Sequence, residues 1–260
     1  MTNVYCENVK VLNQSYKVKP IDKSGLFLFH IDILNYYKDI TTLKAILDET
    51  ETSRAERYHF EKDKNRFIIC RSILKIILAQ YTEQDILDIK LKKDTNQKPY
   101  LVSNNSINFN LSHSEDSAII AISNSNVGVD LEYKNNEFDF LEITNHSYSE
   151  AETKHVLNSK NQIDTFYKYW TRKEAIAKFS GQGINDNLSQ IPSIDGRHTT
   201  NLNSLNKFKN LKVLSFALNE NYIASVAFCN KKKDDDVLTI FSLPSSLKEL
   251  LNPNNKTDYQ

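Results

Sequence analysis

The amino-acid sequence predicts an α+β fold of two halves, each with a helix packed on a small, mostly antiparallel sheet. Three observations support this prediction. The chain has 260 residues, a length that suits one large domain or two packed halves. Strand-like and helix-like patterns follow one another in the order strand, helix, strands, helices, strands. The asparagine-rich stretch 123–126 forms a candidate junction between the halves.

The first half opens with a strand and a helix. Residues 25–33 are rich in Phe, Leu and Ile and follow the chain-breaking sequence Lys-Ser-Gly at 23–25. A buried strand is therefore expected there. Between residues 63 and 81, apolar side chains recur at steps of three and four, which predicts an amphipathic helix. The other face of this helix carries Lys64, Arg71 and Lys75.

Three short strands are expected next, at residues 107–112, 117–123 and 127–133. Only short connections separate them, so they are interpreted as a meander of neighbouring strands. The junction 123–126 lies between the second and the third strand.

The second half is predicted to begin with helices and to end with a hairpin. Ser149 and Glu152 match a capping box, which marks the start of a helix. A second helix is expected over residues 164–179, where a Gly-Gln-Gly sequence at 181–183 ends it. Two apolar segments, 211–219 and 222–229, flank Glu220 as a closing hairpin.

These patterns divide the chain into three parts. Residues 1–124 form the first half, residues 125–230 form the second half, and residues 231–260 form a polar extension. Within the extension, an apolar segment at 237–251 is a candidate for a last docked helix, and residues 252–260 are expected to fray. No function is assigned to the extension or to residues 1–24.

Composition excludes several classes of protein. The chain has 33 basic and 33 acidic residues, so no global field attracts it to nucleic acid or to an anionic membrane. The three cysteines are widely spaced and odd in number, which favours reduced thiols in the cytoplasm. A signal sequence and a membrane-spanning run are not recognisable. We therefore expect a cytoplasmic protein that binds neither nucleic acid nor membranes.

Asp130 and Glu132 form the first candidate site. Side chains two residues apart share one face of a strand, so these two carboxylates are expected side by side. Paired carboxylates suit a hard cation such as Mg²⁺, although a solvated polar face is the commoner explanation of this spacing. Gly128 favours the metal site, because a glycine within a strand permits the close approach of a backbone or a ligand.

Trp170, Glu174 and Lys178 form the second candidate site, since steps of four place them on one stripe of a helix. An ordinary surface pair of Glu174 with Lys178 would contribute about 0.3 to 0.5 kcal/mol. Beside a metal, however, Glu174 can act as a third ligand and proton acceptor. Lys178 can then neutralise the charge on a leaving phosphate.

Further polar residues have weaker signals. Ser112 and His113 end a predicted strand, where they are either structural or able to hold a phosphate. Arg54, Arg66 and Lys98 are scattered cations whose default role is solvation of the surface. Only a shared anionic ligand would unite them.

The motifs occur together in an order that resembles the 4'-phosphopantetheinyl transferase superfamily, in its larger Sfp-like branch. Three blocks carry the resemblance: residues 109–114 (FNLSHS), 127–132 (VGVDLE) and 170–175 (WTRKEA), the last followed by Lys178 and by residues 181–184. Residues 97–100 (QKPY) are similar to a further element of the family, in which Gln97 replaces a smaller residue. The resemblance runs from about Arg54 to Cys229.

The resemblance implies a fold of two pseudo-symmetric halves with coenzyme A bound between them. By motif position, Asp130, Glu132 and Glu174 would hold Mg²⁺ against the diphosphate of coenzyme A. The residues implied to contact the nucleotide or its phosphates are Lys178, Ser112, His113, Lys98, Arg54 and Arg66.

The implied reaction moves the phosphopantetheine arm of coenzyme A to a serine of an acyl- or peptidyl-carrier protein and releases 3',5'-ADP. Glu174 would accept the proton of the serine hydroxyl, and Lys178 would stabilise the leaving group. A monomer is expected, because one two-half chain completes its own site. The alternatives are a degenerate module that binds coenzyme A or a carrier protein without transfer, and a metal phosphoesterase.

Overall fold

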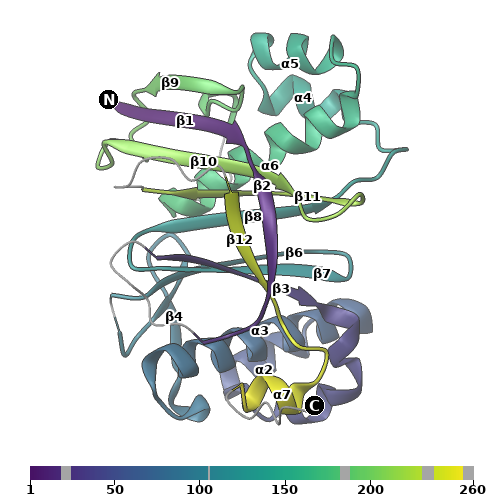
Figure 1. The fold of residues 1–260 in the computed structure, drawn as a ribbon, viewed down its shortest axis with the longest axis vertical. Coiled ribbons are helices and arrows are strands. Elements are labelled where there is room, and N and C mark those ends of the chain that lie inside the picture. The colour runs from purple at the N-terminus through teal and green to yellow at the C-terminus, as the bar shows by residue number, and fades with distance from the viewer. Residues whose placement is uncertain (19–24, 105, 182–187, 230–236, 254–260) are drawn as a thin grey trace.

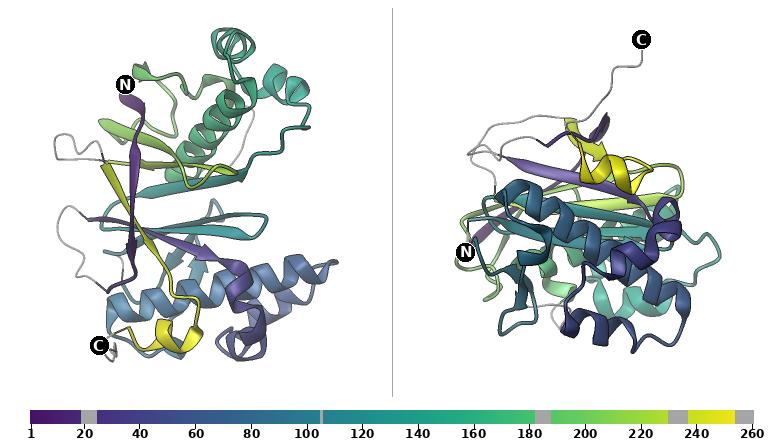
Figure 2. Two further views of the ribbon diagram at one scale, coloured as in Figure 1. Left: turned by 45° about the vertical axis from the view of Figure 1, so that its right-hand side comes forward. Right: turned by 90° about the horizontal axis from the view of Figure 1, so that it is seen from below.

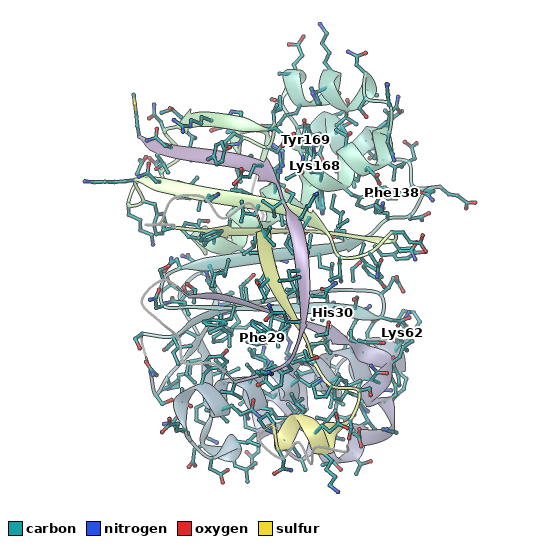
Figure 3. The ribbon with its side chains drawn as sticks, viewed as in Figure 1. Phe29, His30, Lys62, Phe138, Lys168 and Tyr169 are labelled. Carbon is teal, nitrogen blue, oxygen red and sulfur yellow. The ribbon has the colours of Figure 1, made fainter. Side chains whose placement is uncertain are left out.

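A computed structural model of the chain describes residues 1–18, 25–104, 106–181, 188–229 and 237–253. The described chain is stacked in layers, with helices, a sheet, a second sheet and helices again from one end to the other (Figures 1 and 2). Side chains fill the space between the layers. Phe29 lies in the core of one half and Tyr169 in that of the other (Figure 3).

The first sheet contains five strands and is covered by helix α3. Its order is β2 (Lys10–Ser15), β12 (Val237–Ser242), β3 (Leu26–Asp32), β7 (Ser117–Ser123) and β6 (Asn108–Ser114). Helix α3 (Glu61–Thr82) packs most of its length against this sheet. Smaller elements surround them: η1 (Ile33–Asp39), α1 (Ile40–Lys44), α2 (Glu49–Ala55), η2 (Ile86–Asp88), the hairpin of β4 (Leu91–Lys93) with β5 (Pro99–Leu101), and α7 (Leu247–Leu251).

The second sheet also has five strands, and helix α6 covers it. Its order is β8 (Val127–Tyr133), β11 (Tyr222–Phe228), β10 (Asn210–Ala217), β1 (Thr2–Asn8) and β9 (Gly196–Thr200). Helix α6 (Gln162–Ser180) lies on this sheet, with α4 (Leu141–Ser147), α5 (Glu150–Leu157) and η3 (Leu188–Gln190) beside it. The predicted capping box of Ser149 and Glu152 opens α5.

The two halves repeat one topology. In the first half β3 pairs with β7 and β7 pairs with β6, and in the second half β8 pairs with β11 and β11 pairs with β10. All four pairings are antiparallel, and a long helix follows the first strand of each set. The predicted α+β fold of two similar halves is therefore confirmed.

The sheets pack face to face through an apolar core. Strand β7 shows this arrangement best, because every one of its residues is buried. Ile120 and Ile122 belong to the core beneath α3, while Ile119 and Ala121 belong to the core between the sheets. Since alternate residues of a strand point to opposite faces, β7 must be covered on both sides.

The structure corrects the predicted meander. Strands β6 and β7 form the expected hairpin, but β8 leaves this sheet and forms the edge of the other one. The free edge of β7 is taken by β3, with the register Phe29 to Ile120. The short connections predicted that all three strands would be neighbours in one sheet. Instead, β8 pairs with β11 and β7 pairs with β3, which are distant in the sequence.

The ends of the chain cross between the halves. Strand β1 lies in the second sheet, between β10 and β9, although its residues belong to the predicted first half. Strand β12 lies in the first sheet, between β2 and β3. The prediction of a polar extension from residue 231 does not describe residues 237–251, which form β12 and the short helix α7 rather than one docked helix. Residues 230–236 and 254–260 lie outside the described residues.

Candidate active site between the two halves

A cavity of about 460 Å³ lies between the two halves. One wall comes from α2, α3, the β4–β5 hairpin and β6, and the other wall comes from β8 and α6. Of the predicted site residues, the cavity brings together Arg54, Ser112, His113, Asp130, Glu132, Glu174 and Lys178. Arg66 and Lys98 do not line it.

Strand β8 and helix α6 touch at Gly128. A Cβ atom on this residue would lie 2.1 Å from the carbonyl oxygen of Ala175 and 2.3 Å from the amide nitrogen of Phe179. Only glycine permits this approach of strand and helix. Gly128 therefore makes room for the backbone of α6. This contact brings Asp130 and Glu132 of β8 close to Glu174 and Lys178 of α6.

The opposite side of α6 is fixed by two buried cations. Arg172 donates to Ser215 Oγ and to the carbonyl of Ser193, both at 2.6 Å. Lys173 forms an ion pair with Glu152 at 2.9 Å. Because both side chains are fully buried, these bonds hold the helix in place while its other face points into the cavity.

Asp130 is the central carboxylate of the cavity. Its Oδ1 atom accepts hydrogen bonds from Lys178 Nζ at 2.6 Å and from Ser112 Oγ at 2.9 Å. Its Oδ2 atom is buried and has no hydrogen-bond partner. Lys178 therefore pairs across the cavity with Asp130, and its ammonium supplies the nearest positive charge to this acid.

Glu132 and Glu174 flank Asp130 and are shifted in the same direction. Burial, followed by the charge of Asp130, raises the pKa of each carboxyl to about 7. The side chains of Ser114 and Trp170 hydrogen-bond to Glu132 and partly oppose this shift. The Oε1 atom of Glu174 is buried without a partner.

The acids do not form a finished metal site. Within the described ranges, no group of three or more His, Cys, Asp or Glu side chains is arranged to hold an ion. The donor set nevertheless fits a hard cation, because buried oxygens of Asp130 and Glu174 lack partners and unpaired buried acceptors are costly. The predicted ligands Asp130, Glu132 and Glu174 are therefore chemically suited to Mg²⁺.

The wall of the first half contributes two arginines. Arg54 places its guanidinium over the ring of Phe67, 4.9 Å from the centroid, and Arg71 lies 5.7 Å from the same ring. Arg71 also contacts Glu51, which forms a buried ion pair with Lys75 at 3.2 Å. Helical periodicity placed Arg71 and Lys75 opposite the apolar stripe, yet α2 covers that face.

Arg66 and Lys98 are engaged elsewhere. Arg66 forms an ion pair with Asp63 one turn before it. Lys98 Nζ donates to the carbonyls of Val127 at 3.0 Å and Phe179 at 3.2 Å, so it ties the β4–β5 hairpin to β8 and α6. Burial lowers the pKa of Lys98 to about 8. These contacts give both residues structural partners within the protein.

Gln97 and His113 also line the cavity. Gln97 has a φ of 66°, a left-handed conformation that favours glycine or asparagine, which explains why a small residue suits this position. His113 lines the cavity and has an exposed side chain. Although solvent reaches this residue, the surrounding protein and the charges of Arg66 and Lys178 lower the pKa of His113 below its usual value, so the ring is neutral at pH 7.

Fold and site define an α+β protein of two similar halves that share a cavity lined by acids and cations. The sequence pattern of the family "4'-phosphopantetheinyl transferase, N-terminal" matches residues 36–125, and that of the "4'-phosphopantetheinyl transferase superfamily" matches residues 126–227. The chain belongs to the 4'-phosphopantetheinyl transferase superfamily and is of the Sfp-like type.

Individual relatives agree with this assignment. The chain is 31% identical to the 4'-phosphopantetheinyl transferase HetI of a Nostoc species, over 60% of this chain and 69% of the relative. It is 30% identical to psf-1 of Bacillus pumilus, over 66% and 75% of the two chains. It is also 32% identical to gsp of Aneurinibacillus migulanus, over 49% and 53%. Among the described residues, the helices are too short or too polar to cross a membrane.

Proposed function

We propose that this transferase moves the 4'-phosphopantetheine arm of coenzyme A to a serine hydroxyl of an acyl- or peptidyl-carrier protein, in a reaction that depends on Mg²⁺. One observation carries the proposal. In a chain of this family, Asp130, Glu132, Glu174 and Lys178 converge from β8 and α6 on a single cavity. The degenerate binding module is disfavoured, because these acids and the lysine are all present.

Glu174 and Lys178 have different roles in the proposed reaction. Glu174 accepts the proton of the carrier serine as the serine oxygen forms a bond to phosphorus. The bond between this phosphorus and the bridging oxygen of the diphosphate breaks, and 3',5'-ADP leaves with the electron pair. Lys178 stabilises the charge on the leaving group.

Asp130, Glu132 and Glu174 would hold Mg²⁺ near the diphosphate. When bound, the ion supplies charge neutralisation and polarises the phosphoryl group. Arg54 and Arg71 face the cavity from the other wall and provide positive charge for the remaining phosphates. His113, neutral at pH 7, offers a ring nitrogen without a further charge.

We also propose that the protein works as a cytoplasmic monomer. Both walls of the cavity come from one chain, which removes the need for a second copy to complete the site. All three cysteines are free thiols, as is usual in a reducing compartment. Size-exclusion chromatography with light scattering tests the oligomeric state.

Incubation with a fluorescent coenzyme A analogue and a panel of apo-carrier proteins tests the activity. The expected result is covalent labelling that requires Mg²⁺, stops with a chelator and is lost in Asp130→Ala. Asp116→Ala is the matched control, because Asp116 is an acid in the β6–β7 turn that pairs with Lys62 outside the cavity. Labelling that is absent with every carrier, or that persists in Asp130→Ala, contradicts the proposal.

A further inference from the structure

The edge strands of the two sheets are joined by side chains. Strands β6 and β8 belong to different sheets, yet alternate residues of β6 accept hydrogen bonds from alternate amides of β8. The three bonds run from Val129 N to Asn110 Oδ1 at 2.8 Å, from Leu131 N to Ser112 Oγ at 3.3 Å, and from Tyr133 N to Ser114 Oγ at 3.0 Å. We call this row the seam.

The seam has a clear physical cause. Strand β8 pairs with β11 on one side only, so the amides on its other side would lack partners. A missing hydrogen bond would cost about 1 to 3 kcal/mol at the buried amides of Val129 and Leu131, whereas Tyr133 lies at the exposed end of the strand. Side chains of β6 satisfy these amides where a backbone ladder is absent, and they fix the position of β8 along β6.

Two members of the seam also reach the acids of the site. Ser112 Oγ donates to Asp130 Oδ1 at 2.9 Å, and Ser114 Oγ donates to Glu132 Oε2 at 3.1 Å. A hydroxyl has one proton, and an amide can only donate to it. Because each hydroxyl accepts from an amide of β8, its own proton is free to point at the neighbouring carboxylate, which it orients.

Ser112 and Ser114 differ in one respect. Ser112 lines the cavity and also accepts a hydrogen bond from Lys178, so it belongs to the machinery already described. Ser114 does not line the cavity. Ser114 can therefore act on the reaction only indirectly, through the Glu132 carboxylate or through the position of β8.

We propose that Ser114 is a positioning residue: its hydroxyl, anchored on the amide of Tyr133, holds the Glu132 carboxylate in the orientation that binds the divalent cation. This role rests on the function proposed above. Partners of metal ligands typically change metal affinity by about 10- to 100-fold when removed. Ser114→Ala should therefore weaken cation binding about ten-fold, while the affinity for coenzyme A measured in the absence of the cation stays the same.

The direct test is titration of the protein alone with Mn²⁺, followed by electron paramagnetic resonance, for wild type, Ser114→Ala and Ser114→Thr. The threonine variant keeps the hydroxyl and should restore binding. Ser117→Ala is the matched control, because Ser117 lies opposite Ser114 on β7 and bonds to His30 rather than to β8. This control should bind Mn²⁺ like wild type. Faster exchange of the Tyr133 amide in Ser114→Ala is a second expected result.

Activity is measured separately, so that the two proposals can fail independently. Wild type that labels no carrier overturns the proposed function, while the Mn²⁺ titration still decides the role of Ser114. Indistinguishable Mn²⁺ binding in wild type and Ser114→Ala, including no binding by either, overturns the positioning role. A loss shared equally by Ser117→Ala also overturns it, since a general effect of losing a hydroxyl from the β6–β7 hairpin would then explain the result.

Discussion

Lys178 and Asp130 balance each other in the cavity. The Lys178 ammonium contacts the Asp130 carboxylate at 2.6 Å. The pKa of the neighbouring Glu132 and Glu174 carboxyls is raised to about 7. A divalent cation that binds Asp130 must compete with this ammonium. Such a cation would then release Lys178 to contact a phosphate.

The variant Lys178→Met tests this competition. Loss of the ion pair, worth roughly 1 kcal/mol at this partly exposed position, should tighten Mn²⁺ binding in the absence of coenzyme A about five-fold. Transfer should fall about 100-fold or more, because the leaving group loses its counter-charge. Lys168→Met is the control, as Lys168 lies on the same helix and pairs with Asp195. Unchanged Mn²⁺ affinity in Lys178→Met contradicts the competition.

Lys98 should give the protein a measurable pH dependence. Its pKa is about 8 when folded and about 10.4 when unfolded, so between these values the unfolded chain binds more protons. Stability should therefore rise with pH through this window, by about 3 kcal/mol at most. Urea unfolding at pH 7.5, 9 and 10 compares wild type with Lys98→Met. The stability difference between them should shift in favour of wild type as pH rises, and a constant difference would refute the assignment.

The spacing of residues predicted which side chains of β8 and of α6 share a face. Asp130 with Glu132, and Trp170 with Glu174 and Lys178, follow from the period of a strand and of a helix. Arg71 was assigned only to the face opposite the apolar stripe, since helical period does not reveal that α2 covers this face. The seam was equally hidden, because hydrogen bonds from Ser114 to β8 depend on how two sheets meet.

At the scale of elements, α6 and β8 form one rigid unit around Gly128. The strand crosses the helix so closely that backbone atoms of Ala175 and Phe179 occupy the space of a side chain. Burial of Arg172 and Lys173 holds the helix from behind. The geometry of the acids is thus set by packing between two regular elements rather than by a loop.

Gly128→Ala should therefore be severely destabilising. The new methyl group would force the strand and helix apart, with a cost of about 3 kcal/mol or more. Gly196→Ala is the control, because nothing lies within 4 Å of its added Cβ and only its φ of 114° is strained. Urea unfolding should show a larger loss for Gly128→Ala than for Gly196→Ala. Equal losses would show that the contact with α6 is not the cause.

Most elements were predictable because their patterns are strong. Helix α3 and strands β3, β7 and β8 have long apolar runs, and the residues that end α6 include Gly181 with a φ of 79°. Strand β2 was not predicted. Its residues are mostly polar and none is buried, so its pairing with β12, not its own pattern, makes it a strand.

At the scale of the whole molecule, the ends of the chain bind the halves together. Strand β1 completes the second sheet and β12 completes the first, each beside a strand from the other end of the sequence. The sequence could not predict this exchange, because a strand's own residues do not say which sheet it joins. The division at residue 124 describes the internal repeat but not a pair of separable domains.

Truncation tests this interlocking. A chain that ends at residue 236 loses β12 and α7, including buried Ile240, Phe241 and Leu250. The loss should exceed the typical total stability of about 5 to 15 kcal/mol once β2 also loses its partner, so the variant should not fold. A chain that ends at residue 253 keeps every described contact and is the control. A well-dispersed NMR spectrum from the shorter variant would contradict the expectation.

Strands β1 and β12 also lead to an expectation for the number of substrate sites in one chain. A chain built from two similar repeats has two related junctions, one where β6 meets β8 and one where β10 would meet β3. In the described part of the chain, β12 occupies the outer edge of β3 and β1 occupies the outer edge of β10. The second junction is thus closed by the polypeptide itself, and the protein should bind its substrate with a stoichiometry of one per chain.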